Sequence, residues 1–123
     1  MTTKDLKSVP TEQLADDFLA LAIAKGEAIM GDQTAQANRL YWRIDAVRKE
    51  LKAREGDQRR FLARFYSHRD PQVRMEAAMA TLAIFPEQAR EVLQSIRDRK
   101  EFPHAGEAGL TLLYLDRGEF KPV

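Results

Sequence analysis

Histidine and cysteine are the residue types that most often ligate metals and act as nucleophiles, and this chain is poor in both. Its 123 residues include two histidines, His68 and His104, and no cysteine. A zinc site needs three or four ligands, and no H-x-x-x-H pair or thiol is present to complete one. We therefore expect both histidines to be solvated loop residues, with no bound metal and no cofactor.

Carboxylates are the second group that could do chemistry, as general acids and bases. Such catalysis needs two carboxyl groups held in a pocket with shifted pKa values. Asp16 and Asp17 point about 100° apart on a helix, so they do not form such a pair. Glu76 and Glu107 occupy equivalent positions of an internal repeat, which indicates a structural role. Because the sequence also lacks a nucleophile elbow, a P-loop and a GxGxxG motif, we expect no enzymatic activity.

Basic residues are concentrated in the middle of the chain, where they could bind phosphates. Residues 39–74 hold eleven Lys or Arg against five Asp or Glu, a local excess of six. Much of this charge can be matched internally, because residues 8–32 carry a net charge of −4, residues 33–54 carry +4, and the two segments should pack antiparallel. The arginines that remain define an alternative function in nucleic-acid binding: Arg59, Arg60, Arg64 and Arg69.

Trp42 is the main candidate for a binding residue. On a helix it projects about 180° from the apolar stripe of Leu40, Ile44, Val47 and Leu51. Exposed tryptophans are enriched in the hot spots of protein interfaces. A neighbouring layer of the same chain could also cover the indole, and the sequence leaves both readings open.

A second apolar stripe lies on the helix predicted for residues 11–30. Beyond the main apolar face of that helix, it carries Leu19, Ile23 and Met30. Either another helix of the chain or a second subunit has to cover it, since large exposed apolar patches usually mark interaction sites. Together with Trp42, these residues predict a protein partner, including a homodimer through this first helix.

Helix signals divide the chain into six elements that have to position these residues. Start and stop residues such as Pro10, Gly31, Pro71, Pro86 and Gly118 set the boundaries. No segment alternates with a period of two, so we predict no strand. The helices are predicted at about residues 11–30, 33–54, 57–67, 71–84, 88–99 and 105–116. The fourth and the sixth are apolar on most sides, which predicts that they are buried.

An internal repeat becomes visible when the chain is shifted by 31 residues. Phe61–Leu62 then falls on Val92–Leu93, and Met79 falls on Leu110. We therefore expect one helical-repeat domain, 1–123, built from three layered helix pairs. Its parts are a lead-in at 1–10, a capping helix pair at 11–56, repeat one at 57–85, repeat two at 86–118 and a C-terminal tail at 119–123.

Local signals predict several contacts. Asp70 should accept hydrogen bonds from the first free N–H groups of the helix that begins at Pro71. Arg74 should reach a carboxylate or a carbonyl in a neighbouring layer. Gly118 should allow a left-handed turn, after which Phe120 packs back onto the last helix.

The overall composition excludes several classes of protein. With 44% hydrophobic residues, 32% charged residues and a net charge of +1, the chain is globular and not strongly basic. The longest apolar run, Phe18–Ala24, is too short to span a bilayer. Acidic residues precede that run where a signal peptide would carry positive charge. We therefore expect a cytoplasmic protein with no membrane partner.

Two resemblances support this description. The run Asp70–Arg74, followed by Ala77, Ala78, Ala80 and Leu82, resembles the second-helix signature of HEAT and armadillo repeats. Over nearly its whole length, the chain also resembles an uncharacterised bacterial family of small α-helical proteins with a domain of unknown function. The residues that carry this resemblance are Asp57–Arg60, Asp70–Arg74, Pro86, Ala89–Arg90, Val92–Leu93, Ala105–Gly106, Leu115–Gly118 and Phe120–Pro122.

The resemblance implies an all-α fold, a short armadillo/HEAT-type α-α superhelix, and it implies no activity. We therefore predict a non-catalytic protein–protein interaction module, such as a small adaptor, inhibitor or regulatory protein. Nucleic-acid binding through the arginine patch is the alternative.

Overall fold

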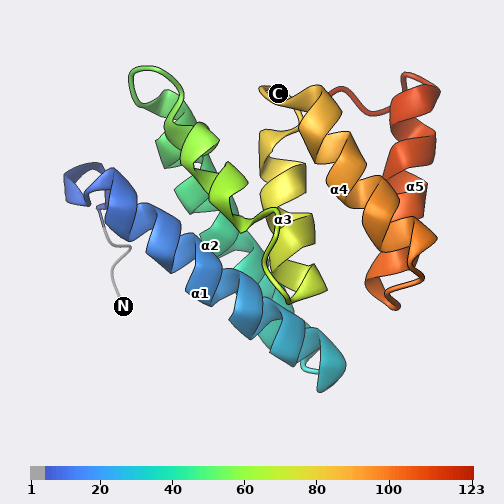
Figure 1. Cartoon of the computed structure of the whole chain (residues 1–123). Helices are drawn as coiled ribbons and strands as arrows, with labels where there is room; N and C mark the ends of the chain where they lie inside the picture. Colours follow the sequence, from blue (N-terminus) through green and yellow to red (C-terminus); the bar gives the residue numbers. More distant parts are fainter. Residues whose placement is uncertain (1–4) are drawn as a thin grey trace. The chain divides into compact units, whose positions relative to one another are not determined.

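Helices account for all regular structure in the computed structural model, which describes residues 5–123 (Figure 1). The predictions of an all-α fold and of no strand are confirmed for this range. Residues 1–4 of the predicted lead-in lie outside it. The elements are η1 Leu6–Ser8, α1 Thr11–Met30, α2 Thr34–Ala53, η2 Gln58–Phe65, α3 Pro71–Thr81, α4 Pro86–Asp98 and α5 His104–Asp116, where η marks a 3-10 helix.

Contacts divide the chain into two compact units, Met1–Phe61 and Leu62–Val123. In the first unit α1 packs against α2 (Figure 1). The buried residues of α2 are the predicted stripe: Ala37, Leu40, Ile44, Val47 and Leu51. Arg54, just after α2, donates to the Thr11 hydroxyl at 3.1 Å and to the Leu6 carbonyl at 2.9 Å, so it ties the end of α2 to the start of α1.

The short helix predicted after Asp57 is present, as a 3-10 helix. The chain passes from the first unit into the second within this segment. Its buried side chains are Arg59, Leu62 and Phe65, which are spaced three residues apart. Side chains at i and i+3 are aligned in a 3-10 helix, so this period places all three on one face.

In the second unit, α4 contacts both α3 and α5 (Figure 1). The side chains between them form one apolar core, and Phe120 packs against it from the C-terminal tail. Gly118 has φ 71°, which is the left-handed turn expected before that tail. The core residues are Met75, Ala78, Leu82, Ala89, Leu93, Ile96, Ala108 and Leu112.

The start of α3 agrees with its sequence signals. Pro71 occupies the first turn, and the Asp70 carboxylate accepts a hydrogen bond of 2.9 Å from the Gln72 N–H. The helix ends at Thr81, short of the predicted end near Ile84. As predicted, α3 is buried on most sides.

Helix α5 differs from its prediction. Only its inner residues Ala105, Ala108, Thr111 and Leu112 are buried. Leu115 packs against the core, but Leu110, Leu113 and Tyr114 are exposed, so the prediction that this helix is buried is wrong. Hydropathy marks a residue as apolar but does not show whether the same chain covers it.

Candidate functional site

Trp42 and Tyr41 form an exposed aromatic pair on α2. The Trp42 side chain is 65% exposed and Tyr41 is 48% exposed, so the reading in which another layer covers the indole is wrong. The two rings meet edge to face, with centroids 5.0 Å apart and planes at 84°. The Lys25 ammonium of α1 lies 5.2 Å from the centre of the Tyr41 ring. Tyr41 therefore contacts both the lysine and the indole, and Trp42 is the more exposed of the two aromatic residues.

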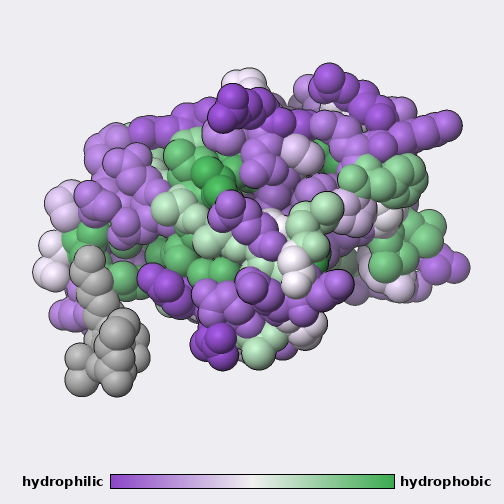
Figure 2. Space-filling view, turned by 90° about the horizontal axis from the view of Figure 1, so that it is seen from below, coloured by the Kyte–Doolittle hydropathy of each residue, from purple (hydrophilic) through white to green (hydrophobic). Residues whose placement is uncertain are grey.

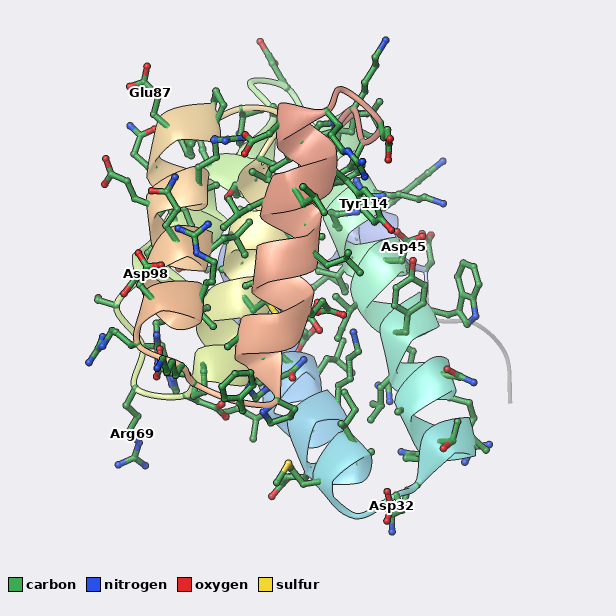
Figure 3. All side chains as sticks on the ribbon, turned by 90° about the vertical axis from the view of Figure 1, so that its right-hand side faces the viewer. Asp32, Asp45, Arg69, Glu87, Asp98 and Tyr114 are labelled. Carbon is green, nitrogen blue, oxygen red and sulfur yellow. The ribbon has the colours of Figure 1, made fainter. Side chains whose placement is uncertain are left out.

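Charged side chains flank the aromatic pair along α2. Asp45, labelled in Figure 3, accepts hydrogen bonds from Arg48 at 2.9 Å and Lys49 at 3.0 Å. Partial burial acts to raise the pKa of Asp45, but the two cations outweigh this effect and hold the pKa below its usual value. Asp45 is therefore a paired anion beside Trp42.

The second apolar stripe of α1 is only partly available. Leu19 and Ile23 are half-buried, so this part of the stripe leaves little apolar surface for a partner. Met30, at the end of α1, is 70% exposed, and the adjacent Ile29 is also exposed. In the view from below, apolar surface occurs as separate patches among polar residues (Figure 2).

The predicted arginine patch loses one of its four members. Arg59 is buried, and its guanidinium donates to both carboxylate oxygens of Asp57 at 2.9 and 2.7 Å. These bonds lower the pKa of the Asp57 carboxyl. Burial acts in the opposite direction but is the weaker effect, so the pKa lies below its usual value. Arg60, Arg64 and Arg69 are exposed, and Arg69 lies just before α3 (Figure 3).

Arg74 makes the predicted contacts with a carboxylate and a carbonyl. Its guanidinium donates two hydrogen bonds of 2.7 Å to the Glu101 carboxylate, one of 2.7 Å to the His68 carbonyl, and a longer one to the Arg69 carbonyl. These bonds lower the pKa of Glu101, and they raise that of Arg74. The arrangement joins the start of α3 to the segment just before α5.

His104 belongs to a polar chain rather than to a solvated loop, which corrects the prediction. It is the first residue of α5, and its Nε2 lies 2.8 Å from Oε1 of the buried Gln72. Gln72 in turn donates to Glu76 at 2.7 Å. The Nδ1 atom of His104 is buried without a hydrogen-bond partner. His68 is also engaged, since its Nδ1 accepts from the Asp70 N–H.

The structure reveals one apolar surface that the sequence did not predict, on the outer side of α5. Leu110, Leu113 and Tyr114 are 49%, 46% and 38% exposed. Tyr114 projects from the side of α5 that faces away from α4 (Figure 3). The available signal was the spacing of these residues, which places them on one helical face opposite the buried Ala108 and Leu112.

Neither a metal-binding cluster nor a membrane-spanning helix occurs within residues 5–123. Residues 5–123 contain no group of three or more His, Asp or Glu side chains that could hold a metal ion. Within the same range, no helix has both the length and the apolar content needed to cross a membrane.

The chain is similar to known proteins both in sequence and in structure. Residues 12–116 match a family described as a domain of unknown function, DUF2019. The crystal structure of the protein RPA1889 from Rhodopseudomonas palustris is 40% identical and superimposes with a TM-score of 0.95, covering 98% of this chain and 100% of that one. A search of curated proteins gives no match.

Proposed function

The chain belongs to the DUF2019 family, a domain of unknown function, and we propose that it acts in the cytoplasm as a non-catalytic protein-binding module. The observation that carries the proposal is the exposed pair of Trp42 and Tyr41 on one rigid helix. A tryptophan 65% exposed leaves a large apolar area in water, and its burial in a partner is favourable. Aromatic residues in such positions dominate binding energies at protein interfaces.

The surroundings of Trp42 indicate the chemistry of the partner. Arg39 and Arg43 are exposed on α2, within one turn of the indole. Asp45, on the other side, is neutralised by Arg48 and Lys49. The partner surface therefore offers an apolar pocket for the indole with carboxylates at its rim, because opposite charges at a rim favour association.

Armadillo/HEAT-type layering of the helices is part of the same proposal. Its support is local: α3 starts with Asp70 and Pro71, Arg74 binds Glu101, and α4 packs on both α3 and α5. Repeat proteins of this kind present rigid surfaces for binding, with no chemistry of their own.

The test is capture of partners from a bacterial lysate on the wild-type protein, on Trp42→Ala and on Phe102→Ala, each with and without nuclease. Phe102 is the matched control, since it is another aromatic residue, 71% exposed, that lies outside α2. We expect a protein that survives nuclease, is lost with Trp42→Ala and is kept with Phe102→Ala. With that partner purified, Trp42→Ala should raise the Kd about 30-fold, which corresponds to about 2 kcal/mol.

Two results would contradict this function. The first is a large loss of thermal stability in Trp42→Ala, because an exposed indole should contribute little to folding. The second is recovery of nucleic acid through Arg60, Arg64 and Arg69, with binding that falls steeply as salt rises. That outcome would favour the alternative function.

A further inference from the structure

The outer face of α5 is an apolar surface that lies outside the site proposed above. Leu110, Leu113 and Tyr114 share this face with Gly106, while the buried residues Ala108 and Leu112 lie on the opposite side. No side chain of the described chain lies within 4 Å of the position a Cβ on Gly106 would take. The face therefore has a bulky C-terminal half and an open N-terminal half.

We propose that this face binds the same face of a second copy of the chain, with the two α5 helices antiparallel. A twofold axis near Leu110 would bring the two Leu110 side chains together. It would also set each Tyr114 across from Gly106 of the other copy, since both lie four residues from Leu110. The open glycine of one copy thus receives the bulky ring of the other, and a self-complementary face is what a twofold dimer requires.

The charges on α5 agree with the antiparallel orientation. Glu107 lies in the N-terminal half and Arg117 just beyond the C-terminal end, and both are exposed. Helical side chains lean toward the N-terminus of their own helix. In the antiparallel pair Arg117 therefore leans toward Glu107 of the second copy, and the contact forms twice. Among residues 5–123 of one chain, the ion pair that Arg117 would give up is a 4.0 Å contact with Glu119.

A single helical face of this length is smaller than the interfaces of stable dimers, which bury about 1,200 Å² or more. We therefore expect weak association that depends on protein concentration. This dimer uses neither Trp42 nor Met30, so it is independent of the proposed function and of self-association through α1.

Sedimentation equilibrium of the full chain over a wide concentration range tests the proposal. We expect the mass to rise from 14.1 kDa toward twice that value in the wild type and to stay at 14.1 kDa in Leu110→Asp and Leu113→Glu. Both positions are about half exposed, so these variants should fold, which circular dichroism checks. Phe102→Asp and Met30→Asp are matched controls that replace other exposed apolar residues, and both should dimerise as the wild type does.

Charge exchange then tests the orientation. Glu107→Arg alone and Arg117→Glu alone each place like charges at both contacts. Each variant should therefore raise the Kd of the dimer at least several-fold. A mixture of the two variants restores both attractive contacts and should dimerise again. A wild type that stays monomeric, a dimer insensitive to Leu110→Asp, or a mixture that fails to recover would each overturn the proposal. Loss of the dimer in Met30→Asp would instead indicate an interface on α1.

Discussion

Replacement of Arg74 by alanine should remove a largely buried ion pair of the second unit. The guanidinium is largely buried, with a side-chain exposure of 10%, and it makes two hydrogen bonds of 2.7 Å to Glu101 and one of 2.7 Å to the His68 carbonyl. The variant leaves the Glu101 carboxylate and that carbonyl without these donors.

The cost can be estimated from these contacts. Removal of one partner of a buried ion pair costs about 3–5 kcal/mol. The Glu101 side chain keeps 23% of its surface in water, which can solvate part of the orphaned charge, so we place the loss near the lower limit, at about 3 kcal/mol. For a chain of this size, that corresponds to a fall in Tm of about 10 °C.

The assay is urea denaturation followed by far-UV circular dichroism. Fluorescence would be a poor reporter, because the single tryptophan is already exposed in the folded protein. Arg97→Ala is the matched control, since Arg97 pairs with Asp98 on the surface and its loss should leave stability unchanged. Arg74→Lys keeps the charge without the paired geometry and should fall between the two. A loss below about 1 kcal/mol in Arg74→Ala would refute the reasoning.

Two further predictions follow from the same unit. Arg74 lowers the pKa of Glu101 in the folded state. The contribution of this ion pair to the free energy of unfolding is therefore complete above about pH 4.5 and is lost as the pH falls through the lowered pKa. The stabilities of the wild type and of Arg74→Ala should converge in acid. A constant difference down to about pH 2 would contradict this assignment. Gly106→Ala should stabilise α5 by about 0.5–1 kcal/mol, because the position is helical and open, whereas Gly118→Ala should destabilise by about 1 kcal/mol at its φ of 71°. In thermal melts the Tm should rise in Gly106→Ala and fall in Gly118→Ala. A shift of the same sign in both variants would contradict these roles of the two glycines.

The helices were predictable wherever strong boundary signals met a clear apolar period. Thr11–Met30 and Thr34–Ala53 follow from Gly31 and from the stripe of α2, and the start of α3 follows from Asp70 and Pro71. The segment after Asp57 was less readable, because over two turns a spacing of three residues is hard to distinguish from the α-helical period.

The candidate site was predictable only in part, because a sequence does not show which side chains the fold covers or pairs. A helical projection shows that Trp42 points away from its apolar stripe, but only the fold shows that residues 5–123 leave the indole largely exposed. Arg59 looked available because charge counts ignore local partners, whereas its bonds to Asp57 allow it to be buried. Leu110 and Tyr114 looked like core residues, since apolar character alone does not distinguish an internal contact from an external one.

The pair of Arg74 and Glu101 also bears on the lifetime of the folded state. These residues are 27 positions apart, on the two sides of α4, which packs on α3 in the folded protein. Closing that loop has an entropic cost, so the pair should form late, after the transition state for folding. Interactions absent from the transition state slow unfolding and leave the folding rate nearly unchanged. We therefore expect the ion pair to slow the unfolding of the second unit more than it speeds its folding.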